Sequence, residues 1–412
     1  MLKGNKRTNI ARTARVLCCQ TAASKHCLIF NMEATTSCLL VYLTACALHG
    51  FLPEKERLSG VNLSDLFDLA KHNSMSALVA YSLKSIGIDD KKWADVYLKA
   101  IRKSLMLDAE CGELMRVMEQ NKIWYMPLKG TVLKDFYPSV GLRERADVDI
   151  LFDGEHRVMI RDYFHKRDYK VCEFNKNIDD VYTKEPIYNF EMHTALFGEN
   201  HDSAWKDYYT DVKSRIIKDE NHQFAYHFSD EDFYIYMMTH AYKHNQAKET
   251  GLRSLADCYV YIQEKNEGLN WCYIEEELQK LGIAEWEKGF RALAIHVFEE
   301  PWNRKTLSLG EQKQLDRLIC FGAYGNLEIF IRDQLMTLQA DKEPITKAIR
   351  RKYIYKRIFP SKELIMDKYS ITIRYKWLVP VTWTLRLIKA LLFERKRIVR
   401  EFFIVRKVES KE

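Results

Sequence analysis

The pair Asp147 and Asp149 is the arrangement in this sequence best suited to chemistry. Alternate side chains of a β-strand point to opposite faces, so Val148, Ile150 and Phe152 would enter a core and both aspartates would share the other face. Adjacent carboxylates repel each other unless a cation lies between them, and Mg²⁺ is typically held by one or two carboxylates together with substrate phosphates. The pair therefore predicts a metal site for nucleotidyl transfer.

The spacing of this pair is not specific by itself. In a chain with 57 acidic residues, about eight acidic pairs at this spacing arise from composition alone. The alternative is an exposed strand edge with two solvated aspartates. The apolar surroundings favour the metal site, because a buried pair of charges without a function would cost stability.

A turn upstream, Lys129-Gly130-Thr131, follows a short apolar run and precedes a helical pattern. Gly130 would let a ligand approach the backbone closely. A helix that begins here offers unpaired N–H groups to a phosphate, and Thr131 could donate its hydroxyl or cap the helix. The alternative is an ordinary turn with no ligand.

Two arginines, Arg143 and Arg145, precede the aspartates. On an extended backbone they would share the face of Asp147, and a guanidinium suits the geometry of phosphate oxygens. We expect them to bind the phosphates of a nucleotide. The alternative is a solvated surface loop.

A third carboxylate follows in the segment that contains Glu191 and His193. On a strand these two side chains would share a face. Glu191 could ligate a metal or take a proton from an acceptor, and His193 could orient a phosphate or the acceptor. The alternative is a half-exposed strand with its polar residues outward.

Further along, His240 and His244 have the spacing that places two side chains on one helix face. A zinc metalloprotease would carry Glu at position 241, where this chain has Ala241. We expect a cationic face, with Lys243, that contacts a triphosphate and is paired by Asp257 of the following helix.

The elements that must position these residues follow from the periodicity of the apolar residues. Residues 33–120 read as helices, and the pattern changes at Lys122. Strands are expected at 123–128, 147–152, 169–174 and 188–196, and helices at 131–137 and 157–167. Helices return from residue 205, with segments at 230–247, 252–264, 273–281 and 381–405.

This order predicts an α+β protein in which a small mixed β-sheet is flanked by N-terminal and C-terminal helical regions. The expected divisions are a disordered or mis-assigned start at 1–31, a helical region at 32–120, a catalytic core at 121–200, a helical domain at 201–340 and a basic helical tail at 341–412.

Taken together, the chemical motifs carry a family resemblance. Residues from about 33 to 380 resemble the uncharacterised nucleotidyltransferase family of the DNA polymerase β superfamily. The resemblance rests on the ordered set Leu128-Lys129-Gly130, Tyr137-Pro138, Arg143, Asp147-x-Asp149-Ile150-Leu151, Glu191-x-His193, His240-x-x-Lys243-His244 and Asp257. It implies a nucleoside triphosphate donor such as ATP, and two Mg²⁺ ions, with Mn²⁺ as a substitute, on Asp147, Asp149 and Glu191.

The chain departs from the superfamily pattern at three points. Gly130 is followed by Thr131 rather than by Ser or Gly, the interval from Gly130 to Asp147 is longer than in many relatives, and the third carboxylate is Glu191 rather than Asp. The resemblance does not supply the acceptor, which could be a small molecule, a sugar, RNA or a protein.

Two other functions fit parts of the pattern. One is a catalytically silent nucleotide- or polyanion-binding module on the same fold. The other is a glycosyltransferase with an Asp-x-Asp metal site, which needs a larger nucleotide-binding sheet than residues 122–197 can build.

Charge and cysteine content limit which partners and which cellular compartment we expect. Residues 347–407 carry 18 Lys or Arg and four Asp or Glu, a net charge of +14, so this tail could contact a polyanion weakly or present a solvated face. The ten cysteines include no CxxC pair, which favours reduced thiols in the cytoplasm over a zinc framework.

The N-terminal segment leaves an alternative to the cytoplasm open. Residues 38–48 are apolar and end near Ala45-Cys46-Ala47, which resembles a secretory cleavage site, but this run lies far from Met1. We expect a cytoplasmic protein that starts at Met32 and has no membrane span, because no stretch reaches about 20 apolar residues.

Overall fold

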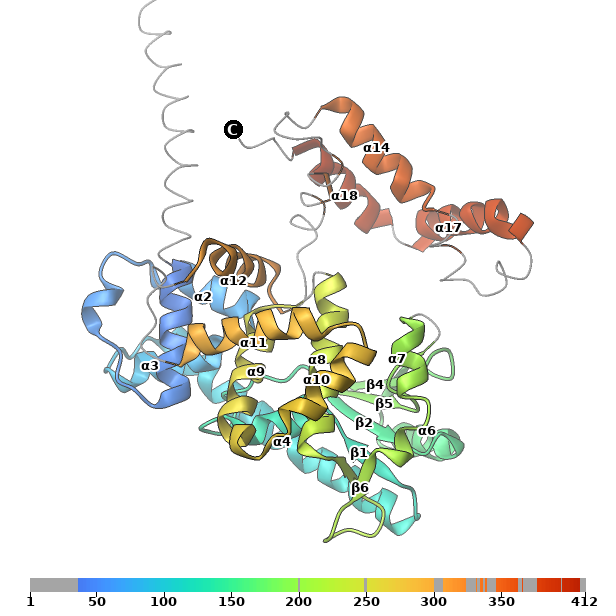
Figure 1. Ribbon diagram of the computed structural model, residues 1–412, viewed down its shortest axis with the longest axis horizontal. Helices are drawn as coiled ribbons and strands as arrows, with labels where there is room; N and C mark the ends of the chain where they lie inside the picture. Colours follow the sequence, from blue (N-terminus) through green and yellow to red (C-terminus); the bar gives the residue numbers. More distant parts are fainter. Residues whose placement is uncertain are drawn as a thin grey trace, which may run out of the picture.

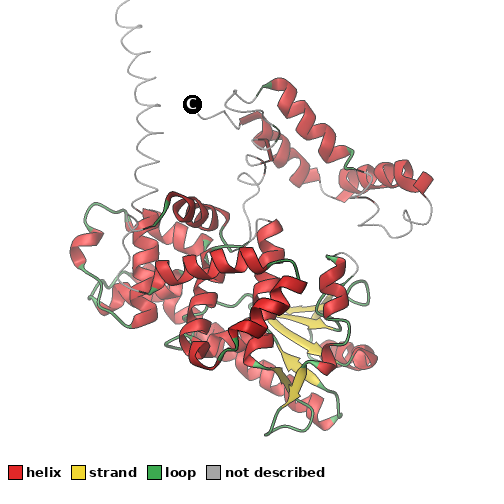
Figure 2. Ribbon diagram, viewed as in Figure 1, coloured by secondary structure: helices red, strands yellow, loops and turns green. Residues whose placement is uncertain are grey.

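The computed structural model describes residues 36–198, 201–247, 250–299, 307–323, 346–361, 376–393 and 395–407. It also describes residues 331, 334, 335, 338 and 365. The expected start segment, 1–31, lies outside the described residues, as does most of 324–345. Helices dominate the described chain, which also contains a five-stranded and a two-stranded sheet (Figure 2). The predicted α+β class with helical flanks is confirmed.

The main sheet has five strands in the order β1-β2-β5-β4-β3. Only β2 and β5 are parallel, and the other neighbours are antiparallel, so the sheet is mixed as predicted. The strands are β1 (Tyr125–Pro127), β2 (Val148–Phe152), β3 (Lys170–Glu173), β4 (Asp179–Lys184) and β5 (Tyr188–His193). The sequence pattern predicted four of them and missed β4.

The two faces of the sheet contact different cores. Val148, Ile150 and Phe152 of β2 lie in one buried cluster with Phe190 and Met192 of β5, as the alternation predicted. This cluster also contains the buried side of α6 (Arg157–Lys166) and the second half of α4 (Lys91–Gln120). The odd-numbered residues of β2 and β5 therefore face the other way, toward the helical body.

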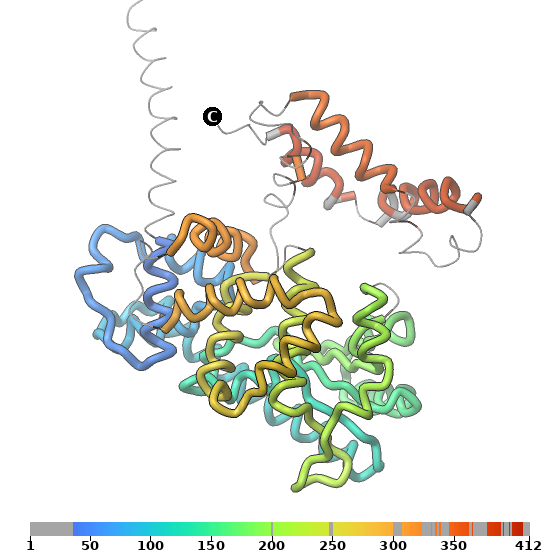
Figure 3. The backbone as a smooth tube through the Cα atoms, viewed as in Figure 1, coloured from blue at the N-terminus to red at the C-terminus, as the bar shows by residue number. Residues whose placement is uncertain are grey.

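The helical body is built from segments that precede the main sheet in the sequence and from segments that follow it. Before the sheet come a helix over residues 36–49, α2 (Leu63–His72), α3 (Ser76–Ser85) and α4. After it come α7 (Ser203–Tyr208), a two-stranded sheet of β6 (Ile216–Lys218) and β7 (Tyr226–Phe228), α8 (Asp230–Ala247), α9 (Leu252–Lys265), α10 (Trp271–Lys280), α11 (Ala284–Phe298) and α12 (Leu309–Phe321). Both groups contribute to one continuous buried cluster, and they lie side by side in Figures 1 and 3.

Local sequence signals explain where several of these helices begin. Asn62 accepts from the N–H of Ser64 at the start of α2, and Asp90 accepts from two N–H groups at the start of α4. The predicted cap of α8 is confirmed, because Ser229 accepts from the N–H of Asp232 at 3.1 Å.

The end of α2 packs closely against the end of α12. The N–H of Ala323 donates to the carbonyl of His72 at 3.1 Å. Gly322 has φ +67°, and a side chain on it would meet His72. Gly251, which precedes α9, lies so close that a Cβ there would be 2.4 Å from the carbonyl carbon of Gly322. Only glycine fits this approach of three segments.

The C-terminal helices are α14 (Lys347–Ile358), α17 (Val379–Phe393) and α18 (Arg395–Lys407), with a 3₁₀ turn at Lys376–Leu378. They form a separate group in Figure 1. Tyr353 and Val405 belong to a small buried cluster of their own, and the Tyr353 hydroxyl donates to Glu401 at 2.7 Å. Among the described residues, no helix is long and apolar enough to cross a membrane.

Replacement of Phe164 by Ala should destabilise the sheet side of the molecule. This α6 ring is fully buried and stacks on Tyr182 with centroids 4.3 Å apart. We expect a loss of about 3–5 kcal/mol in the free energy of unfolding, measured by urea denaturation. Val158→Ala on the exposed side of the same helix should change it by less than about 0.5 kcal/mol. Equal effects of the two substitutions would contradict the assigned core.

Candidate active site

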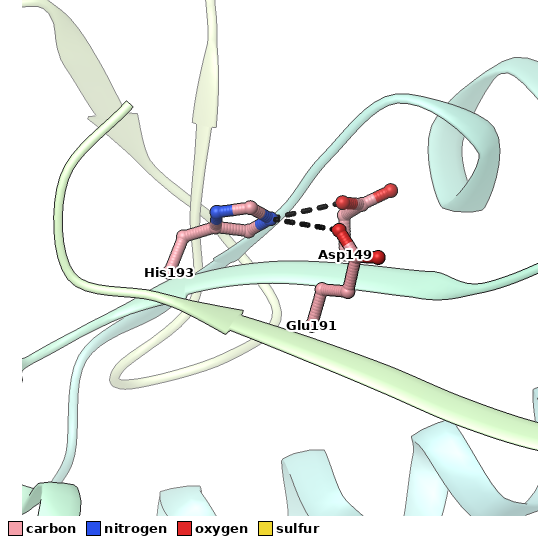
Figure 4. A group of neighbouring side chains, drawn as sticks. All are labelled: Asp149, Glu191 and His193. Atoms are coloured by element: carbon pink, nitrogen blue, oxygen red, sulfur yellow. Dashed lines mark hydrogen bonds and ion pairs between the residues drawn. The ribbon is translucent and has the colours of Figure 1, made fainter. Parts of the chain in front are cut away.

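Asp149 and Glu191 are placed side by side by the parallel pairing of β2 and β5. The ladder pairs Asp149 with Glu191 and Leu151 with His193. His193 Nε2 lies 2.9 Å from Asp149 Oδ1 and 4.0 Å from Glu191 Oε2 (Figure 4). One potential ligand atom from each of these three residues lies within 4.8 Å of the others. The predicted shared face of Glu191 and His193 is therefore present, and it adjoins Asp149.

Asp147 lies in the same cavity but outside this tight group. The strand begins at Val148, so the sheet ladder does not hold Asp147 in register with Asp149. Its carboxylate makes no hydrogen bond or ion pair with the described part of the chain. Burial, and then the negative charge of Asp149, raise its pKa. The group nearest to Asp149 thus contains His193 where the sequence analysis expected Asp147.

Lys129 compensates the charge of Asp149. It follows β1 and is the N-cap residue of the short helix α5 (Gly130–Leu133), with a positive φ of 44°. Its Nζ lies 2.7 Å from the same Asp149 Oδ1 that contacts His193. Burial would raise the pKa of Asp149, but Lys129 and His193 together lower it below its usual range. Asp149 is therefore ionised and Lys129 is its counter-ion.

Glu191 behaves differently from its neighbour. Burial, followed by the negative charges of Asp149 and Asp147, raises the pKa of Glu191 to about 8. At neutral pH the cation-free site thus holds a proton on Glu191. A divalent cation would replace that proton, because metal ligands must be deprotonated.

The donor set fits a hard divalent cation. Two adjacent carboxylates with a third nearby match the oxygen ligands of Mg²⁺ or Mn²⁺. His193 Nε2 lies at hydrogen-bond distance from Asp149, and such a contact fixes the orientation of a carboxylate. This supports Asp149 and Glu191 as metal ligands from the chemistry of the donors.

Arg143 and Asp257 form a buried ion pair, the latch, that joins the loop before β2 to α9. Two guanidinium nitrogens of Arg143 donate to the two oxygens of Asp257 at 2.7 and 2.9 Å, and the Tyr137 hydroxyl donates to the same carboxylate at 2.8 Å. Gly130 permits this packing, because a Cβ there would lie 2.3 Å from Arg143 Nη1. The expected pairing of Asp257 with the histidine face is not found; its partners are Arg143 and Tyr137.

Two further residues expected to bind phosphate, Arg145 and Thr131, have different surroundings. Arg145 Nη2 donates to the Ser104 carbonyl at 3.0 Å and to Asp108 at 2.7 Å. The N–H of Thr131 donates to the Leu128 carbonyl, and its buried hydroxyl has no partner in the described chain. Arg145 still lines the cavity, whereas Thr131 does not.

The histidines of α8 face each other as their spacing predicted. His240 Nε2 lies 3.2 Å from His244 Nε2, so at least one ring is neutral. Burial and the nearby charges of Lys129 and Lys243 hold the pKa of His240 well below its usual range. At most one of the two rings is therefore charged in this arrangement, and the cationic face stays a prediction. Burial and the charge of Lys129 also lower the pKa of Lys243 to about 8.

Sequence reasoning missed Arg253. This residue lies at the start of α9, one helical turn before Asp257, and lines the cavity beside Asp147. Its Nη1 donates to the Glu144 carbonyl at 3.3 Å. The spacing of Arg253 and Asp257 places both on one helix face, which was the available signal.

These side chains surround one cavity of about 340 Å³. Asp147, Asp149 and Glu191 line one wall, and basic residues from the 129–145 segment and α9 line others. Phe233, Tyr236 and Met237 of α8 add an apolar wall. A small molecule with one anionic part and one apolar part fits a cavity of this size and lining.

Comparison with known proteins gives one match. The family model for uncharacterised nucleotidyltransferases matches residues 59–299, which include every cavity residue discussed above. No curated protein and no solved structure matches the chain.

Replacement of Asp257 by Asn should leave Arg143 buried without a full counter-charge. The two side chains are only 9% and 8% exposed. We expect a loss of about 3–5 kcal/mol in unfolding free energy, measured by urea denaturation. Glu113→Gln, which breaks the exposed pair with Arg116, is the control and should have a much smaller effect, because solvent screens exposed charges. A loss as small as the control's would argue against the latch.

Replacement of Glu191 by Gln should change how stability depends on pH. The folded protein binds the Glu191 proton up to a pKa of about 8, against an ordinary value of 4.5, so metal-free wild type loses stability as pH rises through this window. The Gln variant lacks this loss. In EDTA, its Tm should exceed that of wild type by more at pH 8 than at pH 5. A difference that does not vary with pH would contradict the burial of this carboxyl among like charges.

Proposed function

We propose that this chain, which belongs to the uncharacterised nucleotidyltransferase family, moves a nucleoside monophosphate from a nucleoside triphosphate to a hydroxyl or amine acceptor. One observation carries the proposal. The β2–β5 ladder fixes Asp149 beside Glu191, with Asp147 near them, in a cavity that also presents Lys129 and Arg253.

The carboxylates would hold the metal. In this proposal Asp149 and Glu191, with Asp147, bind two Mg²⁺ ions, for which Mn²⁺ can substitute. The bound ions would supply Lewis-acid stabilisation of the phosphate oxygens and favour deprotonation of the attacking hydroxyl. His193 would keep Asp149 in its orientation through the 2.9 Å hydrogen bond.

The cationic side chains would bind the triphosphate. Lys129 contacts Asp149 in the cation-free site and would turn to a phosphate oxygen once a metal replaces it. Arg253 lines the cavity with Asp147, and Lys243 adds positive charge near His240. A phosphate next to His240 and His244 would favour a protonated pair, because a nearby negative charge raises a histidine pKa.

Arg143 and Arg145 would serve this site mainly by holding it together. Asp257 and Asp108 occupy their best-placed donors. Gly130 would contribute space rather than a contact, and Thr131 would support the turn. The apolar wall of Phe233, Tyr236 and Met237 would receive the base, for which ATP is the first candidate.

The competing functions receive less support. A silent binding module would not need three carboxylates at a cavity wall, where burial makes them costly. An Asp-x-Asp glycosyltransferase would bind its nucleotide on a larger parallel sheet. The described main sheet has one parallel pair of strands.

Asp147→Asn and Asp149→Asn should abolish transfer without unfolding the protein. Loss of even an outer partner of a metal site typically costs 10–100-fold, so we expect a direct ligand to cost more than about 100-fold in rate. The assay incubates purified protein with each labelled nucleoside triphosphate, Mg²⁺ or Mn²⁺ and cell extract, and identifies the labelled product. Asp162→Asn, an exposed acid on α6, is the matched control and should retain activity.

The outcomes separate the three functions. Turnover near the wild-type level in either site variant would refute the metal-site assignment. Nucleotide binding without turnover in wild type would support the silent module. A labelled product that forms only from a nucleotide-sugar would support the glycosyltransferase.

A further inference from the structure

The C-terminal helices expose a concentration of large apolar side chains. Those of the last described segments are Tyr355, Phe359, Trp377, Val381, Leu385, Ile388, Ile398, Val399, Phe402 and Phe403, which make up more than half of the exposed large apolar residues in the described chain. Isolated apolar residues on a surface need no explanation, but a concentration of them marks an interaction site.

On α17 these residues form one stripe. Val381, Leu385 and Ile388 follow the i, i+4, i+7 spacing of a single helix face, and each is exposed. Val379 on the same helix is buried, so the helix has an inner face that packs and an outer apolar face. The adjoining Trp377 is 70% exposed.

On α18 an apolar stripe lies among arginines. Val399, Phe402 and Phe403 are exposed, and so are Arg400 and Arg406. The inner face of α18 is already used, because Val405 lies in the small buried cluster and Glu401 accepts from Tyr353 and Arg357. The outer stripe is therefore not needed to hold these helices together.

The charge of this region defines the partner. Residues 347–407 carry a net charge of +14. A surface with both strong positive charge and exposed aliphatic side chains fits a partner that is anionic outside and apolar beneath. Anionic lipid headgroups over acyl chains have that chemistry.

Nucleic acid fits the same charge less well. Stacking on bases uses aromatic or guanidinium planes, whereas Val381, Leu385, Ile388, Ile398 and Val399 are aliphatic and would stay in water on a nucleic acid. We propose that α17 and α18 dock on an anionic membrane surface, with their outer apolar stripes inserted between the headgroups. At 15 and 13 residues these helices are shorter than the roughly 20 needed to span a bilayer, so they would lie in its plane.

Vesicle sedimentation of the full chain tests this proposal. Wild type should sediment with phosphatidylcholine vesicles that contain phosphatidylglycerol and remain in solution with phosphatidylcholine alone. The variant Val399→Ser/Phe402→Ser/Phe403→Ser should bind at least about tenfold more weakly, because it removes apolar side chains that would be buried in the membrane. Arg400→Gln/Arg406→Gln should weaken binding and reduce its dependence on salt.

A matched control distinguishes binding by this surface from nonspecific binding by other exposed apolar residues. Leu98 and Leu105 of α4 are 62% and 55% exposed, so Leu98→Ser/Leu105→Ser removes exposed apolar side chains elsewhere and should bind vesicles as wild type does. Unchanged circular dichroism would show that the variants are folded. Equal binding to neutral vesicles, equal loss in the control, or binding to single-stranded RNA but not to vesicles would each overturn the proposal.

Discussion

The site depends on the balance of charge around three carboxylates in one half-buried cavity. Removal of ionised groups from water is costly, so each needs a compensating partner or a proton. Asp149 has Lys129 and His193, Glu191 retains a proton at neutral pH, and Asp147 relies on more distant cations. The Arg143–Asp257 latch keeps the walls of the cavity together without adding net charge.

The position of Lys129 links this balance to binding. Its ammonium lies 2.7 Å from Asp149 Oδ1, and its backbone has a positive φ that only glycine adopts readily. In the proposed function a divalent cation would compete with this ammonium for Asp149 and would place more positive charge beside β2 than the lysine does.

The sequence predicted the parts of this structure that depend on local pattern. Alternation in β2 and β5 placed Asp149 and Glu191 on one face, and helical spacing placed His240 against His244. β4 escaped detection because its start, Asp179 and Asp180, is acidic. The pairing of Arg143 with Asp257 spans 114 residues, and no local pattern reports such a contact. Asp147 lies just outside the ladder, because the strand begins one residue later than the pattern predicted.

The discontinuous helical body has a consequence for synthesis of the chain. Its first helices pack against segments far downstream, as in the contact between His72 and Cys320, 248 residues apart. At about 5–20 residues per second, the ribosome needs roughly 10–50 s to supply the missing partner. During that interval residues 36–85 lack the part of their native contact surface that residues 252–319 supply. The nascent chain would therefore expose apolar side chains, and slower translation would prolong this exposure.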